Sequence, residues 1–549
     1  MRIIYLFTLL ILSCYFVSIN CSEFHYVETS KGKVLGKQTE SNLVEYLGIR
    51  YAQPPTGAYR FQPPQDLETD SYPLQFDSVS GSQPGNDCPQ PSQVDGKPYG
   101  DEDCLFLNVW TPAGVNNTSN LPVFFFIHGG GLFLGTGYDR RWGNPYRYAS
   151  EHNIVAVTLN YRLGLLGFLA LEALDHADQR GISGNYGFLD QLKALQWVQD
   201  NIKQFGGDPN QVTIGGQSAG GFSVLALTSS KLSEGLFQRG IAMSAAPGLF
   251  QTQKEASKDN LKAFVPNTAC KGMAGNDLIK CLYQLDWEDF VTGLEECPDC
   301  GQPYWGFPKY PQVVKYPLAV VDGYFLENSF NKTFKNDLNQ KVDLIISWLT
   351  EEIDLSPSKV ILDYSKEQYQ DLVTNYFDQF KKGLGSQVYN LYPFENYDNP
   401  QQGYDQISSE IAIGCQLISH VQSLAKNLEK HNKNVYMYIS PQRPQYHYCS
   451  NQNYCARYAY HGFDQISSFN DSISIQLGDS DLQFGNNIRW FFADFIRNGY
   501  ISDPAWMPYQ YIQNITWLQY PEPELIPNPK IDKCNFWSQN GFDQWEYQL

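Results

Sequence analysis

The run Gln211-Val212-Thr213-Ile214-Gly215-Gly216-Gln217-Ser218-Ala219-Gly220 joins a short apolar segment to a segment of small residues through a pair of glycines. Gln211–Ile214 is predicted to form a strand and Ser218–Thr228 a helix. Glycines at 216 and 220 permit a strained turn with closely packed backbones, which leaves the Ser218 hydroxyl exposed above the sheet. A GxSxG pentapeptide arises by chance in roughly one such chain in four. The strand and helix around it favour a nucleophile elbow.

Apolar runs elsewhere in the chain alternate with segments of helical periodicity. Leu121–Ile127 and Ile154–Leu159 are predicted to be buried strands, and the spacing of apolar residues from Gly187 to Phe205 predicts a helix. This alternation predicts an α/β fold with a large, mainly parallel sheet and helices on both faces. Ligands then lie at the carboxyl ends of the strands. Further strands are predicted at Ile241–Met243, Leu344–Ile346 and Val435–Tyr438, and residues 250–340 are expected to be a loop-rich insertion or lid.

The composition excludes several classes of protein. The chain has 549 residues, with 39 Lys and Arg against 58 Asp and Glu, for a formal net charge of −19. A protein that neutralises phosphates carries basic faces, so nucleic-acid binding is not expected. Apolar residues make up 42% and charged residues 18%, which predicts a large packed core rather than disorder. Length alone would suggest three or four domains, but no linker divides the chain.

The first residues have the pattern of a targeting segment. Residues Ile3–Ile19 are nearly all apolar and follow a single positive charge at Arg2. This pattern predicts a signal peptide over residues 1–21, with cleavage near Cys21 or Ser22. The alternative is an uncleaved membrane anchor, but the run is at the short limit for crossing a bilayer and no basic cluster follows it. The expected product is secreted or enters the lumen of the secretory or vacuolar system, with no stable membrane insertion.

Cysteine usage agrees with export. Twelve Cys are present, and ten remain after Cys14 and Cys21, an even number that indicates disulfides in an exported chain. Cys297 and Cys300 form a CxxC pair, which could be a metal or redox site instead of part of the disulfide set. No second such pair or His pair accompanies it, so no metal is expected. Sequons that would be glycosylated in an exported chain occur at Asn116, Asn117, Asn331, Asn470 and Asn514.

A glycine-rich run follows the predicted strand Leu121–Ile127. His128-Gly129-Gly130-Gly131 allows the backbone to approach a ligand with no Cβ in the way. Its N–H groups would suit an oxyanion, for which one donor is typically worth about 3 kcal/mol. The alternative is a plain tight turn after a strand.

At these residues the sequence resembles the type-B carboxylesterases, the cholinesterase-like branch of the α/β-hydrolases. The resemblance is strong from about residue 30 to 250, looser afterwards, and covers most of the mature chain. It implies an α/β-hydrolase fold with loop insertions over the active site, formed as a single domain by residues 22–549. The runs that carry it are the elbow with Phe205–Asn210 before it, Glu102–Trp110, Tyr46–Pro55, Asn160–Gly164 and Gly184–Gln191.

The resemblance also implies a catalytic triad in the order Ser, acid, His. Ser218 is the nucleophile. Of the four His beyond residue 352, only His461 lies in an H-G-x-acid run like that of the family, so His461 is the implied base. The alternative, a histidine on a surface loop, suits His431 and His447 better. The matching acid is Glu352. Because Ser347 and Ile353 stand where the family has glycines, Glu351 or Asp354 would serve if the turn slipped by a residue.

The remaining site assignments follow from the same resemblance. N–H groups of Gly130, Gly131 and Ala219 would form the oxyanion hole, and no cofactor or metal is needed. The implied activity is hydrolysis of small-molecule or lipid esters through an acyl-enzyme; the oligomeric state stays open. The implied disulfides are Cys88–Cys104, Cys270–Cys281 and Cys415–Cys534, and Cys449–Cys455 and Cys297–Cys300 are guesses outside that pattern.

Two departures bear on the substrate. The family's choline site has a tryptophan in the loop that corresponds to Ser92–Gly96, which holds none, and Gln217 replaces the usual glutamate before the nucleophile. A quaternary ammonium needs an aromatic surface, so choline esters are not expected and a general carboxylesterase is favoured. The alternatives are a lipase-like hydrolase of acylglycerols and a catalytically inactive adhesion or scaffold protein of the same family.

Overall fold

The computed structural model describes residues 24–39, 42–68, 83–92, 94–139, 142–248, 250–292, 300–301, 313–314, 319–352, 364–397, 399–445, 459–470, 477–509 and 513–542. The expected signal peptide over residues 1–21 lies outside these ranges, as do Cys297, Cys449 and Cys455. Within them, no helix combines the length and the apolar character needed to cross a membrane.

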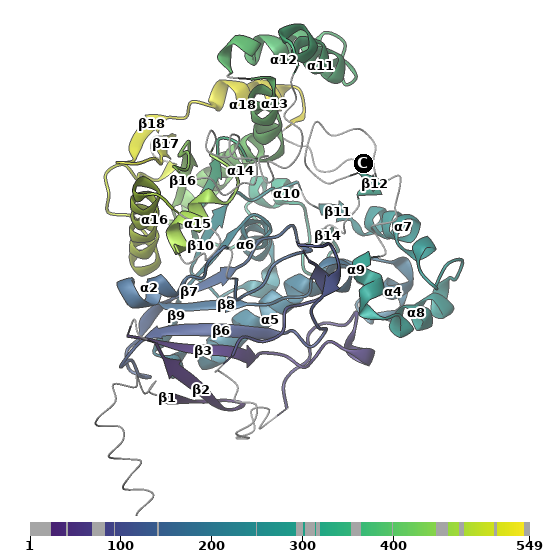
Figure 1. Cartoon of the computed structure of the whole chain (residues 1–549), viewed down its shortest axis with the longest axis vertical. Helices are drawn as coiled ribbons and strands as arrows, with labels where there is room; N and C mark the ends of the chain where they lie inside the picture. The colour runs from purple at the N-terminus through teal and green to yellow at the C-terminus, as the bar shows by residue number, and fades with distance from the viewer. Residues whose placement is uncertain are drawn as a thin grey trace, which may run out of the picture.

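A twisted sheet of twelve strands forms the centre of the molecule (Figure 1). The strands from β8 to β17 run parallel, and antiparallel strands extend the sheet at both edges. The mainly parallel sheet expected from the alternating pattern is therefore confirmed. In spatial order the strands are β1 Phe24–Thr29, β2 Gly32–Gln38, β3 Leu43–Arg50, β6 Phe106–Pro112, β8 Val155–Leu159, β7 Leu121–Ile127, β9 Gly207–Gln217, β10 Arg239–Met243, β15 Asp343–Leu349, β16 Val435–Ser440, β17 Asn514–Trp517 and β18 Glu524–Pro527.

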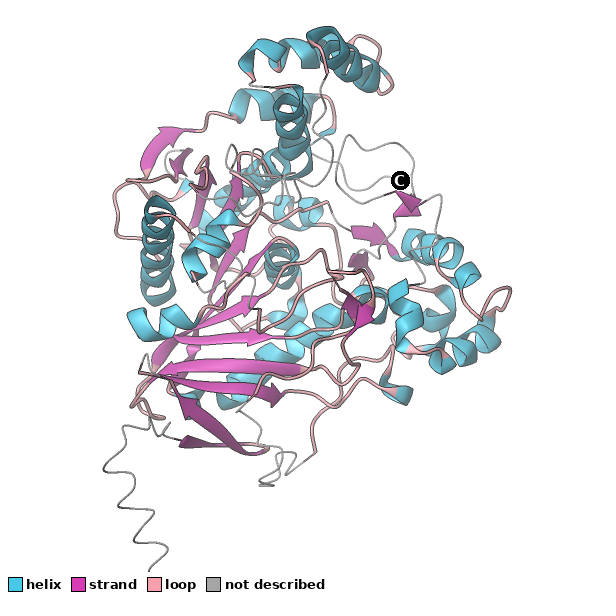
Figure 2. Ribbon diagram, viewed as in Figure 1, coloured by secondary structure: helices cyan, strands magenta, loops and turns pink. Residues whose placement is uncertain are grey.

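Helices cover both faces of this sheet (Figure 2). Side chains of β7 alternate between the two faces: Val123, Phe125 and Ile127 enter one apolar core, and Phe124 and Phe126 enter the other. Strands buried on both faces read as unbroken apolar runs, which is why β7 could be predicted residue by residue. The first core contains α5 Tyr186–Asn201, α6 Ala219–Ser229 and α14 Cys415–Leu428, and the second contains α2 Tyr146–His152, α15 Phe463–Phe469 and α16 Asp479–Asn498.

The ends of most predicted elements differ from the structure by one to four residues, and two of them show why. The strand predicted at Gln211–Ile214 is longer, because Gly215 and Gly216 continue it between β7 and β10. A Cβ at Gly215 would stand 2.4 Å from the ring of Phe124, so the glycine serves close packing inside the strand rather than ending it. The helix predicted from Gly187 to Phe205 ends at Asn201 and continues as a 3₁₀ turn.

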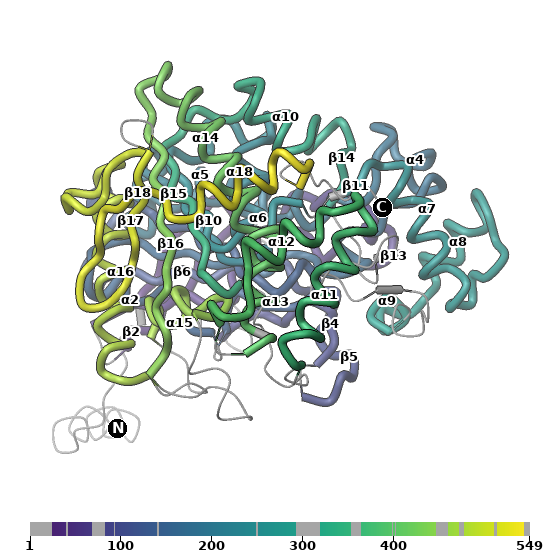
Figure 3. The backbone as a smooth tube through the Cα atoms, turned by 90° about the horizontal axis from the view of Figure 1, so that it is seen from above, coloured from purple at the N-terminus to yellow at the C-terminus, as the bar shows by residue number. Residues whose placement is uncertain are grey.

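The segment expected to be a loop-rich insertion contains helices, so that description was wrong in part. In Figures 1 and 3 the helices between residues 253 and 292 lie beside α4, at one side of the sheet, whereas the last helix, Phe330–Lys335, packs against α14 and α6. Phe264, Leu282 and Phe290 form a separate apolar cluster there with Phe61 from the main body. The helices are α7 Gln253–Ala263, α8 Gly275–Gln284, α9 Trp287–Thr292 and α10 Phe330–Lys335; α4 is Glu172–Ala177.

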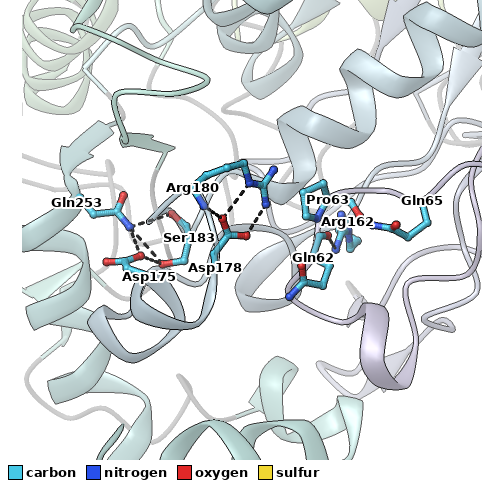
Figure 4. A network of polar contacts seen from close by, with 9 residues as sticks. All are labelled: Gln62, Pro63, Gln65, Arg162, Asp175, Asp178, Arg180, Ser183 and Gln253. Carbon is cyan, nitrogen blue, oxygen red and sulfur yellow. Dashed lines mark hydrogen bonds and ion pairs between the residues drawn. The ribbon is translucent and has the colours of Figure 1, made fainter. Parts of the chain in front are cut away.

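Polar contacts fasten this segment to the body of the protein. The Gln253 amide at the start of α7 donates to the Asp175 carboxylate and, at 3.2 Å, to the Ser183 hydroxyl (Figure 4). On the far side of the segment, Asn185 Nδ2 donates to Asp322 Oδ2 at 2.8 Å. Ser183 and Asn185, in the loop that precedes α5, therefore bind the segment at Gln253 and at Asp322.

The remaining strands and helices lie outside the central sheet. They are β4 Gln90–Pro91, β5 Pro98–Tyr99, β11 Phe250–Thr252, β12 Cys300–Gly301, β13 Val313–Val314, β14 Ala319–Val321, α3 Gly164–Phe168, α11 Lys366–Asp378, α12 Leu384–Leu391, α13 Pro400–Ser409, a π-helical turn Glu410–Gly414 and α18 Ile531–Gln539.

Disulfides close two local loops and one long one. The described residues contain Cys88–Cys104, Cys270–Cys281 and Cys415–Cys534, the pairs that the family resemblance implies. The last joins α14 to α18 across 119 residues, whereas Cys270–Cys281 spans 11. Cross-linking a longer loop removes more conformational entropy from the unfolded chain.

We therefore expect the two disulfides to differ in their effect on stability. Replacing Cys415 and Cys534 together by alanine should lower the free energy of unfolding by about 5 kcal/mol, and replacing Cys270 and Cys281 by about 3 kcal/mol. Urea unfolding of both double variants measures the difference. A larger loss from the Cys270–Cys281 pair would contradict the loop-entropy explanation.

Candidate active site

Ser218 occupies a strained turn between β9 and α6. Its backbone has φ 60° and ψ −123°, a conformation that costs a non-glycine residue of the order of 1–3 kcal/mol. Two hydrogen bonds hold the turn: Ser218 N donates to Met243 O at 2.9 Å, and Phe222 N donates to Ser218 O at 2.8 Å. Ser218 is half-buried. The parallel pairing of β9 with β10 thus holds the residue in a conformation that it would not adopt alone.

Glycines let this turn pack against its surroundings. A Cβ at Gly216 would lie 2.3 Å from the carbonyl carbon of Gly220, and a Cβ at Gly220 would lie 2.0 Å from Ile127 O. Neither position tolerates a side chain without moving backbone. The two glycines of the pentapeptide are therefore required by close approach of α6 to β9 and to the end of β7.

The glycine-rich run after β7 lies directly against Ser218. A Cβ at Gly129 would come within 3.0 Å of Ser218 Cβ and 2.7 Å of Gln217 O. Gly130 and Gly131 have φ values of 106° and 63°, and Gly130 O accepts N–H groups of Phe133 and Leu134. The run is thus a tight turn after a strand, and it lies beside the elbow.

His128 is a structural histidine. Its ring stacks on Tyr161 with centroids 4.4 Å apart, and Nδ1 lies 2.8 Å from Gly129 O. Burial lowers the pKa of His128 to about 4, so the ring is neutral at pH 7 and Nδ1 carries the proton that the carbonyl accepts. The ring fixes the start of the glycine-rich run.

Glu352 and His461, 109 residues apart, meet through a hydrogen bond. The Glu352 carboxylate is fully buried; Oε1 accepts Leu349 N–H at 2.6 Å and Oε2 contacts His461 Nδ1. An Nδ1–H that donates to the carboxylate leaves Nε2 as the acceptor of the imidazole. The turn after β15 therefore fixes the orientation of the His461 ring through Nδ1.

The histidine turn packs against the elbow. Gly462 has φ 83°, and a Cβ there would lie 3.1 Å from Trp142 and 3.4 Å from Gln217 Nε2. Gly462, which follows His461, thus lies close to Gln217, which precedes Ser218. The segments that follow β7, β9, β15 and β16 come together at the carboxyl edge of the parallel strands, where the sequence pattern places a ligand.

Among the described residues, the alternatives for the acid and the base have other surroundings. The carboxylate of Glu351 accepts Ala459 N–H at 3.2 Å instead of an imidazole, and Asp354 lies outside the described residues. His431 lies 3.2 Å from Asp337 on the surface. Burial in α14 lowers the pKa of His420 to about 3. His447 is also outside the described ranges.

Asp464 is a buried carboxyl beside this pair to which the sequence analysis gave no role. Its Oδ2 accepts the Tyr438 hydroxyl at 2.7 Å and its Oδ1 accepts Gln465 N–H at 2.9 Å. Burial raises the pKa of Asp464 to about 6, and the charge of Glu352 adds to the increase. The run His461–Asp464 was recognised as a pattern, but no sequence signal shows that its last residue reaches the neighbouring strand β16.

Several of the other matching runs build the framework behind the site. Arg60 forms two 2.6 Å hydrogen bonds to Glu102, next to Cys104. Arg162, after β8, binds the buried Asp190 of α5 through its main-chain N–H and its guanidinium, and donates to Gln62 O at 2.8 Å (Figure 4). The loop that carries Arg162 also contacts the end of the glycine-rich run, since Gly164 N donates to Leu132 O at 2.8 Å.

The described part of the chain holds no group of three or more His, Cys, Asp or Glu side chains arranged to bind a metal ion. The sequons differ in exposure: Asn116 and Asn117 lie on an exposed turn, whereas Asn331, Asn470 and Asn514 are half-buried.

Comparison with known proteins identifies relatives along the chain. The model of the carboxylesterase family matches residues 23–537. Liver carboxylesterase 1F of Rattus norvegicus is 37% identical over 288 residues, 49% of each chain, and para-nitrobenzyl esterase of Bacillus subtilis is 40% identical over 236 residues, 42% of this chain and 46% of that one. The chain thus spans about half the length of these curated relatives. Carboxylesterase 1F of Mus musculus is 28% identical over 560 residues, 94% of this chain and 93% of its own.

Solved structures share the fold. A PNB esterase superimposes with a TM-score of 0.72 at 27% identity, covering 94% of this chain and 99% of that one. EstA of Aspergillus niger gives a TM-score of 0.75 at 26% identity, covering 95% and 99%. The fold is the α/β-hydrolase fold, as the sequence resemblance implied.

The raised pKa of Asp464 predicts a specific pH dependence of stability. The folded value of about 6 exceeds the ordinary value of 3.8, so the folded state binds the extra proton, and the contribution of Asp464 to stability falls as pH rises from 4 to 7. Relative to an Asp464→Asn variant, the free energy of unfolding of the wild type should fall by about 2–3 kcal/mol over that interval. Denaturant unfolding at both pH values measures it. Parallel pH curves for the two proteins would contradict the assignment.

Proposed function

The chain belongs to the carboxylesterase family, and from this premise we propose that it hydrolyses carboxylic esters through an acyl-enzyme on Ser218. The observation that carries the proposal is the hydrogen bond of buried Glu352 to His461, in a turn packed against the nucleophile elbow. The family's reaction requires a hydroxyl, a base and an acid that orients the base. These three residues supply them.

In the proposed reaction, Ser218 Oγ attacks the ester carbonyl while His461 Nε2 takes the hydroxyl proton. The carbonyl oxygen becomes an oxyanion. Collapse of the tetrahedral intermediate breaks the bond to the alcohol, and His461 gives its proton to the leaving alkoxide. Water then attacks the acyl-enzyme, again deprotonated by His461, and the acid leaves as the proton returns to Ser218.

The oxyanion would be held by the N–H groups of Gly130, Gly131 and Ala219. Two features support this assignment. The glycine-rich run lies against Ser218, and Ala219 is the first residue of α6, where main-chain N–H groups lack partners within the helix. Each such donor would lower the barrier by about 3 kcal/mol, because it is in place before charge develops.

Glu352 would act by electrostatics and orientation. When His461 becomes an imidazolium, the buried carboxylate stabilises the new positive charge in a region with little solvent screening. Its other oxygen accepts Leu349 N–H, which prevents rotation of the carboxylate away from the ring. The acid needs no proton transfer of its own.

The proposed substrates are neutral esters. Gln217, beside Ser218, is buried and uncharged, and the loop after β4, where the family has its choline-site tryptophan, carries the exposed aliphatic Val94. Neither feature offers the aromatic or anionic surface that a quaternary ammonium needs. The proposed location is the secretory route, which the disulfides suit, with glycans at the exposed Asn116 or Asn117.

We expect Ser218→Ala to lower kcat on a nitrophenyl ester at least about a thousandfold, because no other group supplies the nucleophile. The matched control is Ser229→Ala at the other end of α6, whose hydroxyl has no hydrogen-bond partner among the described residues and whose loss should leave kcat within about twofold. A rate assay on both purified variants measures the effect.

A fluorophosphonate probe completes this test. The wild type should be labelled at Ser218, and Ser218→Ala should not be labelled. A folded wild-type protein that resists labelling would identify it as an inactive member of the family. Residual turnover of Ser218→Ala above about a thousandth of the wild-type rate would indicate another nucleophile.

Chain-length and interface preferences separate an esterase from a lipase. A general carboxylesterase should hydrolyse soluble short-chain esters with ordinary saturation and show no rise in rate when tributyrin passes from solution to emulsion. Turnover of nitrophenyl esters of increasing acyl length, with tributyrin on either side of its solubility limit, measures this. A sharp rise at the emulsion would overturn the esterase reading in favour of an acylglycerol lipase.

A further inference from the structure

Glu351 stands next to the proposed acid but faces a different partner. Its side chain is 9% exposed, and its Oε2 accepts Ala459 N–H at 3.2 Å and the hydroxyl of Thr350. Ala459 lies two residues before His461. Two consecutive glutamates of one turn therefore reach the same segment: Glu352 contacts the imidazole, and Glu351 contacts the backbone that carries it.

The main chain of Glu351 holds the same segment. Glu351 N donates to Ala459 O at 3.3 Å, and an isolated parallel bridge pairs Glu351 with Tyr460. Both the N–H and the carbonyl of Ala459 are thus bound to one residue. Two bonds of opposite polarity fix the segment along the direction of β15 as well as its distance from that strand.

The surroundings of Glu351 suit a structural carboxylate. Burial raises the pKa of Glu351. Hydrogen bonds from Thr350 and Ala459 and the charges of Lys530 and Arg443 offset part of this increase. Lys530 also binds the buried Glu410 at 2.8 Å, so a cationic group is fixed on this side of the turn. The donors that Glu351 meets are all groups that a carboxylate accepts.

Other contacts hold the histidine turn from its far side. Phe463 N donates to Tyr460 O at 3.2 Å, and Asp464 binds Tyr438 of β16. Arg489 of α16 donates to Ser468 O at 2.6 Å, at the end of α15. On the side of β15, Glu351 binds Ala459 and pairs with Tyr460, the residues immediately before His461.

We propose that Glu351 is a positioning residue, which sets the place of His461 by holding Ala459 and Tyr460 to the end of β15. The inference rests on the proposed function, since it assigns Glu351 to the same reaction. A shift of about 1 Å in a reacting group can cost a hundredfold in rate. Loss of the hold on Ala459 should therefore lower kcat without changing how substrate binds.

The first comparison uses Glu351→Met and Glu351→Gln. The methionine side chain fills similar space but accepts no strong hydrogen bond, and kcat should fall about 10- to 100-fold with KM within about twofold. The glutamine oxygen still accepts Ala459 N–H, so Glu351→Gln should keep kcat within about threefold. If Glu351 acts by accepting the hydrogen bond, Glu351→Gln must retain activity. If it acts through its negative charge, Glu351→Gln should lose activity as Glu351→Met does.

Asp343 provides a matched control at the other end of β15, about 20 Å away. It is also a buried carboxylate that accepts a backbone N–H, that of Asn434 at 2.9 Å. Asp343→Leu should lower the melting temperature while leaving kcat within about twofold. If it lowers kcat as much as Glu351→Met, the effect of Glu351 is one of general stability and the proposal fails.

A double-mutant cycle with Glu352→Gln tests whether Glu351 acts through the histidine. Once the acid is lost, positioning His461 matters less, so adding Glu351→Met should lower kcat no more than about threefold further. Full additivity of the two effects would contradict the proposal. Should Glu351→Met fail to fold, Thr350→Val removes one hydrogen bond to Glu351 and should lower kcat about threefold at unchanged KM; an unchanged kcat would contradict the proposal.

These outcomes separate the inference from the function on which it rests. A folded wild type that neither hydrolyses esters nor accepts a phosphonate removes the proposed function itself. An active wild type with an equally active, folded Glu351→Met variant leaves the function intact and overturns only the role of Glu351.

Discussion

The hydrogen bond between Glu352 and His461 is the contact on which the proposed chemistry depends. It joins residues 109 positions apart in the chain, in a place where the carboxylate has no access to water. A buried carboxylate is costly unless its oxygens are satisfied. Here one oxygen accepts the N–H of Leu349 and the other meets the imidazole, so the bond that orients the histidine also compensates for the burial of the acid.

The parallel sheet is what makes this meeting possible. β9, β10, β15 and β16 lie side by side and end at the same edge, so turns that are remote in sequence are neighbours there. The strained conformation of Ser218 is held by β10 and by glycines that admit α6 and β7 to close range. Strain of this kind persists because the surrounding structure fixes the residue from several sides.

Much of this arrangement could be predicted because the central strands carry unbroken apolar runs and the elbow has its own glycine pattern. β7 was predicted to the residue. The antiparallel strands β1 to β3 and β6 were not predicted, because polar residues interrupt their apolar runs. In β6 the interrupting residues Asn108 and Thr111 are themselves buried. β9 was predicted too short because Gly215 serves packing against Phe124 rather than a turn.

The site could be predicted as a set of residue types but not as a set of contacts. Sequence order alone left Glu351, Glu352 and Asp354 as candidates for the acid, because consecutive acidic residues in a turn differ only in where the backbone directs them. The structure directs Glu352 to the ring and Glu351 to Ala459. Asp464 shows the same limit, since its partner Tyr438 lies on another strand.

Proton NMR of the His461 Nδ1–H tests the central claim most directly. A proton that Nδ1 donates to a buried carboxylate should give a single resonance downfield of the amide protons in the wild type and in Ser218→Ala. The account predicts that Glu352→Gln abolishes it in a folded protein. Its absence from the folded wild type, or its persistence in Glu352→Gln, would contradict the assignment of Glu352 as the partner of the proposed base.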